Sequence, residues 1–308
     1  MRDAFVRALV ELARKDKRIE LITGDLGFGV LKPFWEEFPD QFTNAGIAEQ
    51  NMVSVAAGMA LEGKTVFVYS IGNFPTLRCL EQIRNDCAYH NANVKIVCVG
   101  GGFAYGSLGV SHHATEDIAC LRAIPNMTVM APGDAMEADA CVRALVAHPG
   151  PAYLRLGRGG EKRIHETTIE NFTVGKALRI HEGERVALFS TGAIYEEVAG
   201  AYEALKKQGL SPALYTFPTI KPIDRALIEN VAQYFDLVLT CEGHNVLGGF
   251  GSAVSEILVA TDNRKAKGLL LGVHDRFTET AGDREFLRIQ EEIDSQNIAL
   301  KVLEKLRG

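Results

Sequence analysis

The sequence predicts an α/β protein of two domains, each with a mostly parallel sheet flanked by helices. Short apolar runs of strand length alternate with segments of helical periodicity along the chain. The strand-like runs are apolar throughout, as expected when helices cover both faces of a parallel sheet. A length of 308 residues also suits about two domains.

The first unit begins with a predicted helix over 3–15, where Phe5, Leu9 and Leu12 recur at helical spacing. A second helix, over 50–61, is rich in small residues. The other elements expected here are strands at 19–23, 65–70, 94–100 and 127–130, and helices at 76–89, 115–124 and 135–148.

A second unit follows the less regular stretch 157–175. We expect a first domain over 1–165, a linker over 166–177 and a second domain over 178–308. The elements expected in the second domain are strands at 186–192, 213–217, 237–243 and 267–273, and helices at 195–209, 224–235 and 251–260.

Composition argues against several classes of function. The net charge is -6 and no basic stripe is present, so nucleic acid is not an expected partner. No apolar run reaches the roughly 18 residues of a membrane span, and charges interrupt residues 1–16, so we expect a cytoplasmic protein without membrane contact. The six cysteines form no CxxC pair and are expected to be free and mostly buried: Cys79, Cys87, Cys98, Cys120, Cys141 and Cys241.

Glycine-rich and polar segments follow three predicted strands of the first unit, at 23–29, 69–76 and 100–113. In open α/β sheets, ligands bind at this carboxyl edge. None of the segments fits the dinucleotide fingerprint or a P-loop. Tight turns are the alternative interpretation. Glu49, near the start of a helix, similarly could do no more than complement the helix dipole.

Longer segments give these residues a context. The pieces GDLG (24–27), AGIAEQN (45–51) and SHHATEDIACLRAIPNMTVMAPGD (111–134) resemble the transketolase family in sequence and order. TIKPIDRALI (219–228) and EGHNVLGGFGSAVSE (242–256) resemble its C-terminal domain. The resemblance covers nearly the whole chain and begins at the family's middle, pyrimidine-binding domain.

The resemblance implies a thiamine diphosphate enzyme whose active site lies between subunits. In the family a separate domain holds the diphosphate through Mg²⁺ with a GDG motif, which this sequence lacks. We therefore expect a partner subunit that carries the diphosphate-binding half and most contacts to Mg²⁺, with no metal ligands here. We expect self-association through both domains, as α2β2.

The same resemblance assigns roles at the cofactor. Glu49 would bond the pyrimidine ring nitrogen and so help the coenzyme's own amino group to act as base. Phe74 would stack on the pyrimidine. Asp25 and Leu26 would lie near the thiazolium ring. A core phenylalanine and a turn-forming aspartate are the alternatives for Phe74 and Asp25.

Substrate contacts are implied for four further residues. His112 matches a histidine that handles hydroxyl protons, a role suited to imidazole. His113 beside it replaces a glutamine of the family pattern. Arg158 and Arg2 would hold the sugar phosphate, since guanidinium groups pair well with phosphate oxygens, although both could be solvated arginines.

Two departures from the family concern the substrate. Leu108 stands where an aspartate helps to read a hydroxyl, and a histidine is replaced within 97–102. An apolar replacement relaxes or inverts such a preference, so we expect a sugar pair other than the usual pentose phosphates.

The predicted function is transfer of a two-carbon ketol unit between sugar phosphates. The chain would be the C-terminal-half subunit of a split transketolase. One alternative is a β subunit of a 2-oxo acid dehydrogenase or a deoxyxylulose phosphate synthase-like enzyme, which uses the same glutamate and aromatic residue. A non-catalytic regulatory homologue is the second alternative.

Overall fold

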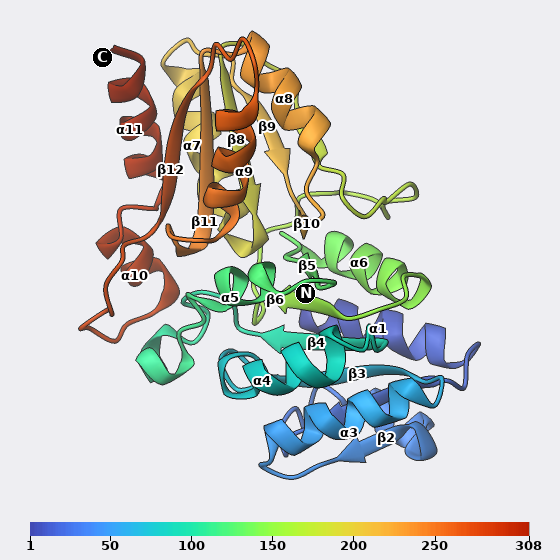
Figure 1. The fold of residues 1–308 in the computed structure, drawn as a ribbon. Coiled ribbons are helices and arrows are strands. Elements are labelled where there is room, and N and C mark those ends of the chain that lie inside the picture. Colours follow the sequence, from blue (N-terminus) through green and yellow to red (C-terminus); the bar gives the residue numbers. More distant parts are fainter. Residues whose placement is uncertain (308) are drawn as a thin grey trace.

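The computed structural model describes residues 1–307 and contains two sheets, one in the lower and one in the upper part of the molecule in Figure 1. The seven-stranded sheet has the order β10-β5-β6-β4-β3-β1-β2, and the five-stranded sheet has the order β12-β11-β8-β9-β7. Only the β10–β5 and β7–β9 pairs among the described strands are antiparallel. The predicted fold class, two mostly parallel α/β domains, is confirmed.

The first domain alternates strands and helices as the apolar pattern predicts. Its strands are β1 (Ile19–Thr23), β2 (Phe42–Asn44), β3 (Thr65–Ile71), β4 (Val94–Val99), β5 (Thr128–Met130) and β6 (Ala152–Leu156). Its helices are α1 (Arg2–Ala13), α2 (Lys32–Glu37), α3 (Glu49–Leu61), α4 (Leu80–Gln82), α5 (Asp117–Ala123) and α6 (Ala135–Ala147). The helix expected at 76–89 is instead a 3₁₀ turn, the short α4 and a π-helical segment, Ile83–Ala88.

The second domain contributes an additional strand to the first sheet. Its strands are β7 (Leu178–His181), β8 (Val186–Thr191), β9 (Ala213–Thr216), β10 (Thr219–Lys221), β11 (Leu237–Asn245) and β12 (Lys267–Val273). Its helices are α7 (Tyr195–Lys207), α8 (Arg225–Tyr234), α9 (Phe250–Ala260), α10 (Arg284–Gln290) and α11 (Ser295–Arg307). β10 leaves this domain to pair with β5, so the two domains share a sheet edge.

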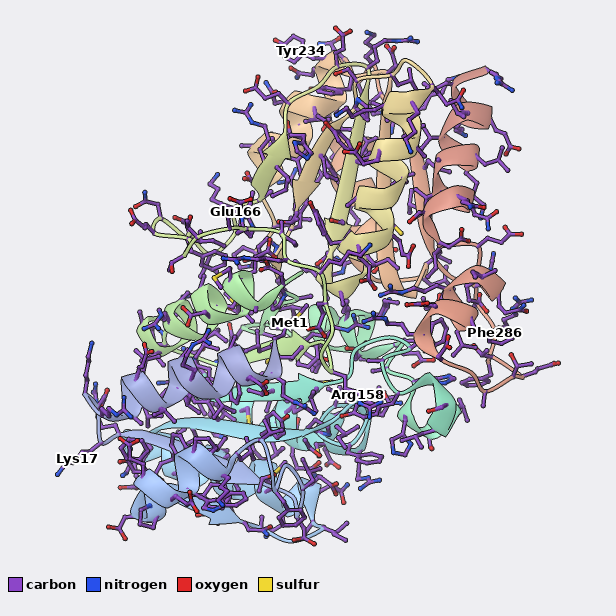
Figure 2. The ribbon with its side chains drawn as sticks, turned by 180° about the vertical axis from the view of Figure 1, so that it is seen from behind. Met1, Lys17, Arg158, Glu166, Tyr234 and Phe286 are labelled. Atoms are coloured by element: carbon purple, nitrogen blue, oxygen red, sulfur yellow. The ribbon has the colours of Figure 1, made fainter. Side chains whose placement is uncertain are left out.

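The junction between the domains also holds the chain's beginning. Met1, labelled in Figure 2 close to Arg158, is buried, and its amino group lies 3.0 Å from Oε2 of Glu161. Lys221, at the end of β10, donates to the carbonyl oxygen of Arg122 at 2.9 Å. The described chain between β6 and β7 contains no helix or strand that would mark where one domain ends and the next begins. The domain limits at 165 and 178 therefore stay a prediction.

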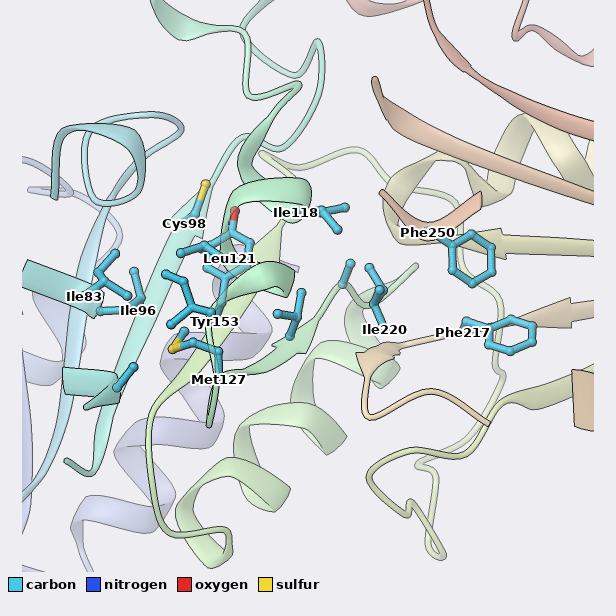
Figure 3. Packing of buried hydrophobic residues seen from close by; sticks show 14 of the residues in the cluster. Ile83, Ile96, Cys98, Ile118, Leu121, Met127, Tyr153, Phe217, Ile220 and Phe250 are labelled. Atoms are coloured by element: carbon cyan, nitrogen blue, oxygen red, sulfur yellow. The ribbon is translucent and has the colours of Figure 1, made fainter. Parts of the chain in front are cut away.

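One hydrophobic core is continuous across this junction. Figure 3 shows Ile118, Ile220 and Phe250 within a single cluster that runs from the first sheet into the second. α1 and α6 cover the opposite face of the first sheet, over Phe67 and Tyr69 of β3. Burial on this scale opposes relative motion of the domains, so residues contributed by both can form one rigid surface.

Candidate functional site

The polar segments lie where parallel strands end together. β4, β3 and β1 are neighbours in the sheet, so the loops after Thr23, Ile71 and Val99 leave the same edge. The structure thus brings the three predicted segments to one place.

Glu49 is the first residue of α3, and its side chain is only 3% exposed. Its Oε2 accepts a hydrogen bond from Nη1 of Arg78 at 2.7 Å, and Arg78 itself is 46% exposed. Gly24, at the end of β1, faces the carboxylate: a Cβ there would lie 3.4 Å from Cγ of Glu49. The absence of a side chain at Gly24 keeps the space beside Glu49 free.

Asn44 joins the loop after β1 to the loop before α3. Its Oδ1 accepts from the backbone N–H groups of Asp25 and Gly46, both at 3.0 Å, while its Nδ2 donates to Oδ1 of Asp25 at 3.0 Å. Asp25 has φ of 58°, a conformation that costs energy outside glycine and needs such support. Asp25 is exposed and Leu26 is half-buried beside it. Sequence reasoning missed Asn44, although it heads the NAGIAEQ segment.

An aromatic and cationic cluster continues from Glu49. The Cζ of Arg78 lies 4.7 Å from the ring centroid of Phe74. The ring of Phe74 meets His112 edge-on, with 5.3 Å between centroids. The ring of Tyr105 is 6.2 Å from His112. Glu49, Phe74 and His112 therefore belong to one connected group of side chains, with Arg78 as the link that sequence reasoning did not identify.

The cluster ends at two arginines. The Cζ of Arg158 lies 4.9 Å from the ring centroid of Tyr105. Arg158 and Arg2 line a pocket of about 510 Å³ together with Ala104, Gly159, Asp283, Arg284 and Glu285. Nε of Arg2 is buried without a hydrogen-bond partner among the described residues. Burial raises the pKa of Tyr105 above its usual value, so its hydroxyl stays protonated between these cations at neutral pH.

His113 points away from this cluster. It is 3% exposed, its Nε2 lies 3.0 Å from the carbonyl oxygen of Gly106, and its ring meets Phe103 at 5.1 Å. Asn73 donates to the backbone oxygen of His113 at 2.7 Å. These contacts fasten the loop that carries His112, and they give His113 a supporting position behind it.

A buried ion pair lies beneath the same loop. Nε of Arg155 donates to Oδ2 of Asp117 at 2.7 Å, and Nη2 donates to the carbonyl oxygens of Ala114 (2.7 Å) and Gly243 (2.8 Å). Tyr153 also donates to Asp117. Arg155 thus connects the His112 loop to the second domain. The signal in the sequence was a charged residue inside the apolar strand AYLRL.

Two family models together match most of the chain. The model of the transketolase pyrimidine-binding domain matches residues 1–160, and the model of the transketolase C-terminal domain matches residues 175–290. The chain belongs to the transketolase family. The resemblance inferred from sequence is confirmed.

Two relatives match most of this transketolase-family chain. It is 38% identical over 309 residues to a putative transketolase C-terminal section of Methanocaldococcus jannaschii, covering 100% of this chain and 96% of that protein. It is 40% identical over 261 residues to an apulose-4-phosphate transketolase subunit of Phocaeicola vulgatus, covering 83% of each. A solved structure described as a split gene transketolase, inactive beta4 tetramer, superimposes with a TM-score of 0.89 and 34% identity, covering 98% of this chain and 97% of that one.

Similarity extends to a longer enzyme of a different activity. The chain is 34% identical over 307 residues to 1-deoxy-D-xylulose-5-phosphate synthase of Caldanaerobacter subterraneus, but it covers only 49% of that protein. Within residues 1–307, no helix is long and apolar enough to cross a membrane. The same part of the chain contains no group of three or more His, Cys, Asp or Glu side chains placed to hold a metal ion.

Proposed function

We propose that the chain is the C-terminal-half subunit of a split transketolase that moves a two-carbon ketol unit between sugar phosphates with thiamine diphosphate. The observation that carries the proposal is the buried carboxylate of Glu49 at the start of α3, beside Gly24 and connected to Phe74 and His112. A relative of similar extent, named as one subunit of an apulose-4-phosphate transketolase, supports it.

The residues at this edge fit the pyrimidine end of the coenzyme. Glu49 offers a carboxylate shielded from water, Phe74 offers an aromatic ring, and Gly24 leaves room beside Glu49. Leu26 would add apolar contact, and Asp25 is placed at the loop tip by Asn44. When bound, thiamine diphosphate supplies the carbon nucleophile that accepts and releases the two-carbon unit.

The chain's own residues would bind and orient the coenzyme and the sugar. Glu49 would hold a proton on the pyrimidine ring nitrogen, and its burial strengthens that hydrogen bond. His112 would accept and return hydroxyl protons of the sugar, since a half-exposed imidazole can do both. Arg158 and Arg2 would bind the phosphate. His113 would act through the loop contacts that hold His112 in place.

We infer that a second subunit completes the site. Glu49 lies at the carboxyl edge of a single sheet, and the solved split-gene chain has the same extent as this one. The partner would hold the diphosphate and most of the contacts to Mg²⁺. We propose an α2β2 assembly in which the subunits pair through both domains described here.

The sugar pair is expected to differ from the common pentose phosphates. Leu108 is 55% exposed at the tip of the loop, where an acidic group would otherwise read a hydroxyl. A sugar that lacks or displaces that hydroxyl would suit an apolar neighbour.

The proposal is tested by mixing the purified chain with its diphosphate-binding partner, thiamine diphosphate and Mg²⁺. Ketose phosphates and aldose phosphates are then offered in pairs, and products are separated by mass spectrometry. We expect products that have exchanged two carbons. Condensation of pyruvate with an aldose phosphate, with loss of CO₂, would instead support the deoxyxylulose phosphate synthase-like alternative. A complex that binds the coenzyme but catalyses neither reaction would overturn the proposal.

A further inference from the structure

We propose that the C-terminal domain takes part in substrate recognition, with Arg284 of α10 joining Arg2 and Arg158 to bind the phosphate of the sugar. The proposal rests on the proposed function for the identity of the substrate. It goes further in assigning part of the substrate pocket to the second domain.

The pocket is built by both domains of one chain. Arg2, Ala104, Arg158 and Gly159 come from the first domain or its end, and Asp283, Arg284 and Glu285 come from the second. Figure 2 places Arg158 at the junction, on the side where the helix carrying Phe286 approaches the first domain.

Arg284 is held in place from behind. Its Nη2 lies 3.0 Å from Oε1 of Glu196 on α7, and its side chain is 21% exposed. Glu196 is shared with Arg288, which is 5% exposed and also donates to the carbonyl oxygen of Ala193 at 2.9 Å. Arg288 also donates to Oε1 of Glu197 at 3.1 Å, so two carboxylates serve the two guanidinium groups. Arg284 is engaged through Nη2, and its other N–H groups are donors available to a ligand.

The two halves of the pocket cannot shift easily relative to each other. A Cβ on Gly106 would lie 2.5 Å from the carbonyl oxygen of Gly282 and 2.6 Å from Cδ1 of Leu287. Phe103, from the same first-domain loop, packs into the core of the second domain. The loop that carries Tyr105 is therefore pressed against the segment that begins α10, and the three arginines form a fixed set.

The chemistry of the lining fits a hydroxylated anion. Guanidinium groups match phosphate oxygens in pairs. Nε of Arg2 is buried without a hydrogen-bond partner among the described residues and lies 3.9 Å from Oδ1 of Asp3. Asp283 and Glu285 add carboxylate oxygens, which accept hydrogen bonds from sugar hydroxyls. Three cations and two acids together favour a sugar phosphate over either a neutral sugar or a bare polyanion.

In the first test, inorganic phosphate is titrated into the purified chain alone, and binding is measured by calorimetry. Arg284→Gln should weaken phosphate binding about tenfold, the effect of removing one charge-assisted pair. Arg284→Lys keeps the positive charge but not the paired N–H donors of the guanidinium group, and should lose less phosphate affinity. The matched control is Arg276→Gln, because Arg276 also pairs with a carboxylate in the second domain, at 3.4 Å from Glu291, but lies outside the pocket. It should bind phosphate like the wild type.

The second test uses the reconstituted complex. Arg284→Gln should raise KM for a phosphorylated sugar about tenfold while kcat stays within about twofold, since Arg284 contacts only the distal group. Folded Arg284 variants with wild-type phosphate affinity would overturn the inference and leave the proposed function standing. Arg284-dependent phosphate binding by a chain whose complex transfers no ketol unit would overturn the proposed function alone.

Discussion

Each domain buries a glutamate at a helix N-terminus, and the two are used differently. Glu49 of the first domain pairs with one half-exposed side chain, Arg78. Glu242 of the second domain accepts the backbone N–H groups of Phe250 at 2.6 Å and Gly251 at 2.8 Å, the first residues of α9. Glu242 thus holds the start of α9, whereas the partner of Glu49 is a half-exposed side chain.

The space around the two carboxylates also differs. A Cβ on Gly249 would overlap Oε2 of Glu242, so that site is closed. A Cβ on Gly24 would come only to 3.4 Å from Glu49. Burial raises the pKa of Glu242 to about 7, yet nothing can reach it. A buried carboxylate therefore marks a ligand site only where a ligand has space to reach it and to replace its hydrogen-bond partner.

The sharpest test of this difference is Glu49→Gln. The amide cannot hold the proton that the coenzyme requires, so we expect kcat of the reconstituted complex to fall at least about 100-fold. The melting temperature should change little. The matched variant Glu242→Gln should keep kcat near the wild-type value. Near-normal turnover by Glu49→Gln would remove the distinction between the two acids.

Glu242→Gln should act on stability instead. An amide satisfies only one of the two N–H donors, so the free energy of unfolding should fall by about 2 kcal/mol in urea titrations. A folded-state pKa of about 7 lies above the ordinary value of 4.5, so the folded state keeps a proton that the unfolded state loses. Wild-type stability should therefore decline as pH rises from about 4.5 to about 7. The variant should decline less over that window, and parallel curves would contradict the burial assigned to Glu242.

Arg78→Met tests whether Glu49 needs its partner. The methionine keeps the apolar stem but leaves the carboxylate unpaired, which should lower the free energy of unfolding by about 1 kcal/mol, given that Arg78 is half-exposed. In a double-mutant cycle this cost should shrink when Glu49→Gln is also present. An unchanged cost would mean that the pair contributes nothing.

Phe74→Leu should give the smallest effect. Losing the aromatic face removes about 1 kcal/mol of stacking, which corresponds to roughly fivefold weaker binding of thiamine diphosphate by the complex. Tyr234→Leu, on the exposed side of α8, is the control and should leave the affinity unchanged. Equal affinities for all three proteins would exclude Phe74 from the pyrimidine site.

The elements with strong local signals were predictable, and the contacts between domains were not. Strand β3 and helix α3 followed from apolar runs and small-residue periodicity. Strand β10 did not, because its few residues pair with β5 from a distant part of the chain and carry no pattern of their own. Nor does the sequence reveal the π-helical segment at Ile83–Ala88, where a continuous helix was expected.

The same division holds for the candidate site. Glu49, Phe74 and His112 stood out through local motifs, and the fold connects them through rings and charges. Arg78 and Arg284 did not stand out, because each looks like an ordinary helical surface arginine until its distant carboxylate is known. Their roles depend on tertiary contacts that no short motif encodes.

Calorimetric titration of thiamine diphosphate with Mg²⁺ into the chain, alone and mixed with its diphosphate-binding partner, tests most directly whether Glu49 is half of a shared site. We predict weak or undetectable binding to the chain alone and saturable binding to the mixture that is lost with Glu49→Gln. Tight, Glu49-independent binding to the chain by itself would contradict that account.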